Sequence, residues 1–175
     1  YGLGHSNKLF RTLADGGCKL TLLERFIVTM TDASHGGARP QAGYLSLIAG
    51  GPVDWWSGRL PFTTLSSCES EWGGATKAVV CTIALRDTHS FMSGEAQPGP
   101  TPVLCDNKAA VQLSEGNSSS KRLKHIASRI EFLREVVRAE VVVLAHVSAN
   151  CQLADMMTKP LGAAPFHSIR SLLVA

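Results

Sequence analysis

The stretch PVLCDNKAAV, residues 102–111, decides how the rest of the chain is interpreted. A short apolar run ends at Asp106, Asn107 follows it, and small residues that favour a helix come next. This pattern predicts a buried strand over 103–105 that ends on a carboxylate and leads into a short helix. In open α/β sheets, ligands bind outside the carboxyl ends of the strands. Asp106 therefore marks a candidate site, provided that other carboxylates reach the same edge.

The segments around this stretch predict a mixed sheet with helices on its faces. Three strand-like segments precede it, and their short connections favour an antiparallel meander. The predicted strands are 25–34, 42–51, 52–60, 103–105 and 140–147. The predicted helices are 64–92, 107–116, 125–140, 150–159 and 166–175. Gly73 and Gly74 are expected to weaken the start of the first helix by about 1 kcal/mol each.

Length and composition are those of one globular domain spanning 1–175. Hydrophobic residues make up 45% of the chain, and the formal net charge of +3 permits an acidic partner such as nucleic acid without requiring one. The five cysteines form no CxxC pair, so we expect neither a disulfide framework nor a zinc site, and a reducing, intracellular location. No apolar run reaches the roughly 18 residues that span a bilayer, so no membrane partner is expected.

Four acids stand at the ends of predicted strands or in helix starts: Asp32, Glu71, Asp106 and Asp155. If the strands that end at Asp32 and Asp106 are parallel neighbours, both carboxylates emerge at one edge of the sheet. Glu71 shares a helix face with small residues, as expected of a face pressed on a sheet, whereas Glu69 lies about 200° further round. Asp155 follows the last strand, where the chain returns to that edge.

Carboxylates gathered in one pocket raise each other's pKa unless cations neutralise them. Mg²⁺ accepts a few carboxylates together with waters and phosphate oxygens. Two such ions about 3.5 to 4 Å apart would clamp the attacking and leaving oxygens of a phosphodiester. A strand-terminal aspartate alone is often a cap or turn former, but four acids at matching positions favour metal-dependent cleavage of a nucleic-acid backbone.

Five segments, taken in order, carry a resemblance to a known family: TDAS (31–34), TLSSCESEW (64–72), VLCDNKAAV (103–111), LKHIASRIEFLREVV (123–137) and QLADMMTKPL (152–161). They resemble the ribonuclease H domain of copia-type LTR retrotransposon polyproteins over about residues 20–162. The opening of the chain, residues 1–20, is similar to the tail of the connection that joins reverse transcriptase to this domain. A fused reverse transcriptase is therefore an expected partner, and a cytoplasmic particle or the nucleus the expected location.

The resemblance implies the ribonuclease H fold, with three antiparallel strands, two further parallel strands and flanking helices. It also implies endonucleolytic hydrolysis of the RNA strand of RNA–DNA hybrids, in which water attacks in line and leaves a 3′-hydroxyl and a 5′-phosphate. Two Mg²⁺ ions are the implied cofactors, with Mn²⁺ as an alternative. Asp32, Glu71, Asp106 and Asp155 match the family's four metal-binding, catalytic acids.

The chain departs from the family pattern around these acids. The family's DADW is Asp-Ala-Ser-His over 32–35, and its Arg-Ser-Thr-Ser-Gly-Tyr stretch is shortened to ARPQAGY over 38–44. Gly73–Gly74 replaces a methionine and an alanine, and HVSANCQLAD over 146–155 replaces YVPTEEQLAD. We expect these departures to affect how the domain binds the hybrid, and how efficiently it works, more than the hydrolysis reaction itself.

Substrate contacts are predicted from polar and basic residues near the acids or in the helix over 125–140. Asn107 is a candidate donor to a 2′-hydroxyl, and basic groups contact phosphates without reading sequence. His125 and His146 also have ordinary structural interpretations, in a helix start and a strand end. A solvated helix face is likewise the alternative for the basic residues. The candidates are Asn107, His35, Lys121, Arg122, Lys124, His125, Arg129 and His146.

Two other functions fit the same residues. One is a ribonuclease H-fold module that binds nucleic acid with little or no cleavage, which the altered substrate loops favour. The other is an integrase or transposase core, which cuts DNA with a similar acid set. The helix carrying Glu71 between the third and fourth strands, and a last acid that is Asp155, favour the hydrolase.

Overall fold

A computed structural model describes residues 27–36, 39–114 and 126–173. Its elements, in chain order, are β1 (Ile27–Ser34), β2 (Gln41–Ile48), β3 (Gly51–Arg59), α2 (Ser67–Ser93), β4 (Thr101–Cys105), α3 (Lys108–Ser114), α4 (Ala127–Arg138), β5 (Val142–His146), the 3₁₀ turn η2 (Ala149–Cys151), α5 (Asp155–Thr158) and α6 (Ala163–Leu173).

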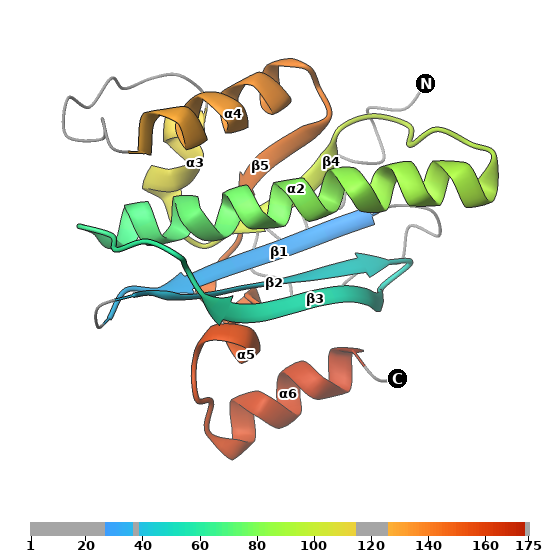
Figure 1. Cartoon of the computed structure of the whole chain (residues 1–175). Helices are drawn as coiled ribbons and strands as arrows, with labels where there is room; N and C mark the ends of the chain where they lie inside the picture. Colours follow the sequence, from blue (N-terminus) through green and yellow to red (C-terminus); the bar gives the residue numbers. More distant parts are fainter. Residues whose placement is uncertain (1–26, 37–38, 115–125, 174–175) are drawn as a thin grey trace.

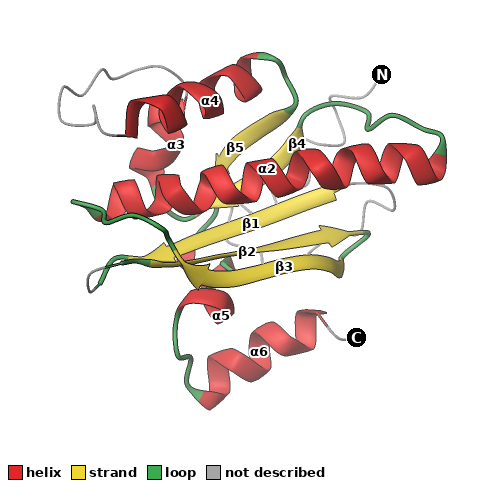
Figure 2. Cartoon of the chain, viewed as in Figure 1, coloured by secondary structure: helices red, strands yellow, loops and turns green. Residues whose placement is uncertain are grey.

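The five strands form one mixed sheet in the order β3-β2-β1-β4-β5. β1 pairs with β2, and β2 with β3, in antiparallel fashion, whereas β4 is parallel to both β1 and β5. The predicted fold class is confirmed. β1 is the central strand and is buried along seven of its eight residues, because helices cover both faces of the sheet (Figure 2).

Two hydrophobic layers hold the sheet between the helices (Figure 1). On one face, α2 crosses the strands and packs with α3 and α4 around Trp72, Val79 and Leu133. On the other face, Met30 and Leu45 pack with the residues around η2 and α5. The sheet thereby sits between the α2 layer and the α5 region, which brings the first turns of α2 and the start of α5 to opposite sides of the same strand ends.

Helix α2 begins at a side-chain cap. The Ser66 hydroxyl accepts from the Glu69 N–H, and the Glu69 carboxylate accepts from the Leu65 N–H at 2.6 Å. The helix ends at Gly94, which adopts the left-handed conformation with φ 72°. The cap fixes the rotational position of the first turns and so decides which glutamate faces the sheet.

Gly74 has a packing role that the helix-propensity argument does not predict. A Cβ at this position would lie 3.2 Å from the Thr31 hydroxyl and 3.3 Å from the Asp32 carbonyl oxygen. The absence of a side chain therefore lets the start of α2 approach the end of β1 closely.

Several predicted boundaries are wrong. The second strand ends at Ile48 because Ala49 and Gly50 adopt positive φ values of 52° and 81° and form a tight hairpin turn. The strand predicted over 103–105 begins at Thr101 and includes Pro102. The last helix begins at Ala163 rather than at Phe166, and its predicted last two residues, 174–175, lie outside the described residues.

The helix predicted over 150–159 is also wrong, because it is replaced by η2 and the four-residue α5. Between them the Gln152 side chain is buried, donates to the Thr31 carbonyl at 2.9 Å and accepts from the Ala154 N–H. The long-range hydrogen bond from Gln152 to Thr31 interrupts a segment whose local sequence favours a helix. Cys151 is disulfide-bonded, whereas the scattered cysteines led us to expect no disulfide framework and a reducing location.

Within the described ranges, no helix combines the length and the apolar character needed to cross a bilayer.

Candidate metal centre

The parallel pairing of β1 with β4 brings the first two acids to one edge. Thr29 pairs with Val103 and Met30 with Leu104, so Asp32 and Asp106 emerge at the same ends of neighbouring strands. Asp155 opens α5 below this edge. Oxygen atoms of Asp32, Asp106 and Asp155 all lie within 4.8 Å of one another, which is a set that can hold a metal ion.

Glu71 reaches the same edge from α2. One of its carboxylate oxygens, the Cys105 sulfur and a carboxylate oxygen of Asp106 lie within 4.8 Å of one another, so Asp106 is common to both groups. Glu71 is 6% exposed. Glu69 instead caps the helix through the Leu65 N–H. The helical periodicity of the sequence thus distinguishes the two glutamates as the structure does.

Burial and the charges of neighbouring carboxylates raise the pKa values of Glu71, Asp106 and Asp155. Desolvation, followed by the charges of Asp32 and Asp106, raises the pKa of Glu71 to about 8. The pKa of Asp106 is raised by burial and by Asp32, and that of Asp155 chiefly by burial. A cation between these groups would relieve this cost, and their oxygen donors suit a hard divalent ion.

Lys159 is a member of the cluster that sequence reasoning missed. Its ammonium lies 3.3 Å from Asp32 Oδ1 and 2.7 Å from Asp155 Oδ1. The neighbouring Thr158 hydroxyl donates to the other oxygen of Asp32. The spacing of Asp155 and Lys159 could have predicted their ion pair, because residues four apart lie on the same side of a helix.

Cys105, the residue before Asp106, was also missed. Its thiol donates to Glu71 Oε2 at 3.6 Å, and its sulfur accepts from the Asn107 N–H at 3.4 Å. Burial and the charge of Glu71 raise the pKa of the Cys105 thiol, so it remains protonated and acts as a donor. The thiol therefore orients the Glu71 carboxylate.

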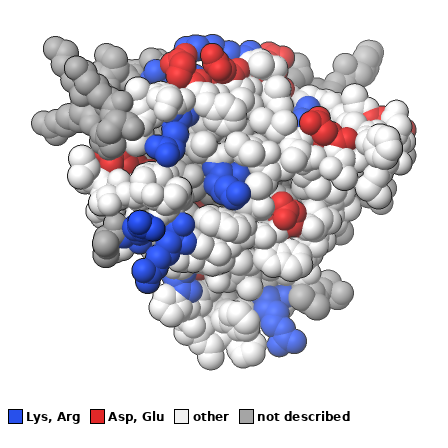
Figure 3. Space-filling model, viewed as in Figure 1, with Lys and Arg blue, Asp and Glu red and all other residues white. Residues whose placement is uncertain are grey.

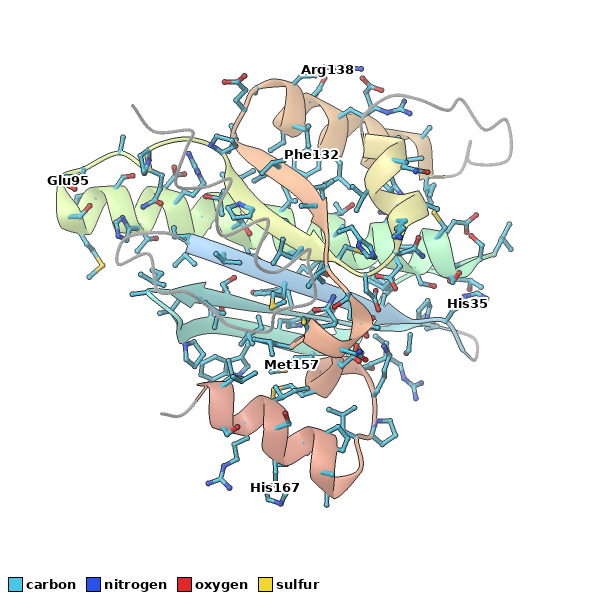
Figure 4. All side chains as sticks on the ribbon, turned by 180° about the vertical axis from the view of Figure 1, so that it is seen from behind. His35, Glu95, Phe132, Arg138, Met157 and His167 are labelled. Carbon is cyan, nitrogen blue, oxygen red and sulfur yellow. The ribbon has the colours of Figure 1, made fainter. Side chains whose placement is uncertain are left out.

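Three of the predicted substrate residues lie at this edge. His35 follows β1 and is labelled in Figure 4. Its Nδ1 lies 3.1 Å from the Ser70 hydroxyl. Asn107 caps α3 by accepting from the Ala110 N–H at 3.1 Å. His146 ends β5 and pairs in register with Cys105.

Arg129 is engaged elsewhere in the described structure. Its guanidinium lies 3.9 Å from the centre of the Phe62 ring. Together with Trp56 and Lys77 these residues line a largely apolar groove beside α2, and none of the four acids lines it. Lys121, Arg122, Lys124 and His125 lie outside the described residues.

Two arginines that the sequence analysis did not select lie at the same end of the sheet. Arg59 ends β3 opposite Gln41, which in turn pairs with Ser34 at the end of β1, and Arg39 precedes β2. Both are exposed. On the face shown in Figure 3, Lys and Arg side chains gather mainly toward the side where β1 and β3 end in Figure 1. An anionic ligand would meet positive charge around the acidic cluster.

The chain is similar to segments of several curated polyproteins. It is 30% identical over 128 residues to the retrovirus-related Pol polyprotein from transposon RE2 of Arabidopsis thaliana, covering 72% of this chain and 9% of that protein. It is 29% identical over 147 residues to the corresponding polyprotein from transposon TNT 1-94 of Nicotiana tabacum, covering 82% of this chain and 11% of that protein. The chain thus spans about a tenth of the length of these relatives. No family model matches it.

Solved structures show the same fold at low sequence identity. LC11-RNase H1 in complex with an RNA/DNA hybrid superimposes with a TM-score of 0.53 at 16% identity, covering 75% of this chain and 93% of that one. The N-terminal RNase H domain of a Mycobacterium tuberculosis protein gives a TM-score of 0.53 at 14% identity, covering 82% of this chain and 98% of that one. The chain is thus an RNase H-like domain that matches the Pol region of copia-type retrotransposon polyproteins.

Proposed function

We propose that this domain hydrolyses the RNA strand of RNA–DNA hybrids with two divalent cations, Mg²⁺ or Mn²⁺. The observation that carries the proposal is the convergence of Asp32, Glu71, Asp106 and Asp155 from separate elements onto one edge of the sheet. Asp106 belongs to both groups of potential ligands, as a residue shared by two neighbouring ions would. Hydrolysis of a phosphodiester is the chemistry that a pair of such ions supplies.

The protein's own groups would hold the ions and orient the substrate. Asp32 and Asp106 would take the central positions, and Glu71 and Asp155 would complete one position each. We expect Asn107, on the loop after β4, to contact a 2′-hydroxyl, and Arg39 and Arg59 to contact phosphates. Selection of the hybrid would then depend on the 2′-hydroxyls and groove shape rather than on base sequence.

The chain's similarity to Pol polyproteins also supports a proposal about the longer protein in which the domain works. We infer that residues 1–175 form one domain, that residues 1–20 are the end of a connection, and that the domain works fused to a reverse transcriptase inside the cell. The solved RNase H1 complex supports an RNA–DNA hybrid as the ligand.

Cleavage of an end-labelled RNA–DNA hybrid tests the proposal. We expect the wild-type chain with Mg²⁺ or Mn²⁺ to cut the RNA strand, and Asp106→Asn to lose at least about 100-fold in rate, since each charged ligand contributes several kcal/mol to stabilising the transition state. Asp87→Asn, which changes an exposed acid on α2, is the matched control and should retain the wild-type rate.

The substrates separate the competing functions. Cutting of duplex DNA in preference to the hybrid would indicate an integrase-like nuclease. Binding of the hybrid without cleavage by either wild type or Asp106→Asn would identify the domain as a binding module and contradict the proposal.

A further inference from the structure

A lysine ammonium lies among the carboxylates where a cation is expected. Lys159 Nζ contacts Asp32 Oδ1 at 3.3 Å and Asp155 Oδ1 at 2.7 Å, so it bridges two acids from different elements. The Asp32 side chain is only 2% exposed, whereas that of Lys159 is 40% exposed. The lysine therefore reaches into a buried site from the solvent side.

This bridge differs from an ordinary surface ion pair. Asp32 has one oxygen bound to the Thr158 hydroxyl and the other to Lys159, so consecutive residues of one segment occupy both of its oxygens. Asp32 and Asp155 belong to the group of three acids whose oxygens lie within 4.8 Å of one another. The ammonium consequently uses oxygen atoms that a divalent ion in this group would need.

We propose that Lys159 is a resident cation that neutralises the acidic cluster without metal and competes with divalent ions for Asp32 and Asp155. This inference rests on the proposed function, because it concerns the same metal centre. Metal entry would require the ammonium to move away, which its long flexible stem and solvent-side position allow. Lys159 is thus a positioning residue that sets the metal affinity of the site.

The competition predicts two effects of opposite sign for Lys159→Met. Without metal, the acids lose a neutralising charge, so the melting temperature in EDTA should fall by a few degrees. With metal, the competitor is absent, so the dissociation constant for Mn²⁺ should decrease by about tenfold, as expected when a positive charge within about 4 Å is removed. A purely structural ion pair would produce the loss of stability alone.

Titration calorimetry of the full chain with Mn²⁺ and with Mg²⁺, in the absence of nucleic acid, measures this effect. Lys159→Gln is the second variant, because it keeps a hydrogen-bond donor while removing the charge, and it should also bind metal more tightly. Lys77→Met removes an exposed lysine that packs on Trp56 in the groove beside α2, and it should match the wild type. Asp32→Asn should bind metal more weakly than the wild type.

The results separate this inference from the proposed function. Equal or weaker metal binding by both Lys159 variants, with hybrid cleavage by the wild type intact, overturns the competition and leaves the nuclease proposal standing. Tighter binding by both variants supports the competition, even if no variant cleaves the hybrid and the nuclease proposal fails. Absence of metal binding in every variant overturns the competition, and the cleavage assay with the hybrid then decides the nuclease proposal independently.

Discussion

Asp32 illustrates how much one residue's environment decides. As the sixth residue of a buried central strand it is 1% exposed, yet it is surrounded by other carboxylates, a hydroxyl and an ammonium. Removing an ion pair or hydrogen-bond partner from such a charge leaves it uncompensated, which commonly costs a few kcal/mol. The cluster is therefore expected to reduce stability in the absence of a cation and to gain stability when one binds.

The buried carboxyl of Glu71 should make the free energy of unfolding depend on pH. Its pKa is about 8 in the folded chain, against an ordinary value of 4.5. Between these values the folded state holds a proton that the unfolded state has lost, so the free energy of unfolding in EDTA should fall as pH rises, by at most about 1.4 kcal/mol per pH unit. Urea denaturation between pH 5 and pH 8 measures this slope.

Glu71→Gln is the matched variant for that measurement, because it keeps the shape and removes the titration. We expect it to flatten the decline in stability between pH 5 and pH 8. A pH dependence identical to that of the wild type would show that Glu71 is not the group responsible.

At the scale of an element, the start of α2 and the end of β1 form one unit. Gly74 allows the helix to lie against the Asp32 carbonyl, and the cap at Ser66 sets the rotation that turns Glu71 inward. The relative position of Asp32 and Glu71 therefore depends on the contact between the two backbones.

Gly74→Val tests this contact. Its side chain would press on the Thr31 hydroxyl and the Asp32 carbonyl, so we expect a loss of stability of about 1–3 kcal/mol, together with weaker metal binding. Ala84→Val, at an exposed position of the same helix, introduces the same side chain and should cost well under 1 kcal/mol. Equal denaturation midpoints for the two variants would contradict the close approach.

At the scale of the whole molecule, the sheet topology places acids and bases at one end. The carboxyl ends of β1 and β4 carry Asp32 and Asp106, while Arg39 and Arg59 lie beside them through the antiparallel pairing. An acidic centre flanked by basic groups suits a polyanion that reaches the acids only together with cations.

Salt dependence tests this arrangement. In an Asp106→Asn background, where cleavage should be absent, Arg39→Ala and Arg59→Ala should each weaken hybrid binding and reduce the slope of log affinity against log salt by about 1. Arg170→Ala, on α6, is the control and should leave the slope unchanged. Unchanged slopes for Arg39→Ala and Arg59→Ala would place the hybrid on another surface.

The local pattern of the sequence was sufficient for those features that depend on periodicity and composition. Alternating and helical spacing predicted the mixed sheet, and the 100° rotation per residue separated Glu71 from Glu69. Asp32 lies near the end of β1, and Asp106 directly follows β4. Predicting that they meet required only that the two strands be parallel neighbours, as they are.

Features that depend on contacts between distant segments could not be predicted from the local sequence. Gln152 interrupts a predicted helix by binding the Thr31 carbonyl 121 residues away, and Lys159 meets Asp32 across 127 positions. Local propensities contain no information on such pairs, because their energy exists only when the sheet has brought the segments together. The local pattern therefore predicted the fold class and selected four acids as candidate ligands, whereas the position of the Lys159 ammonium between Asp32 and Asp155 depends on the folded chain.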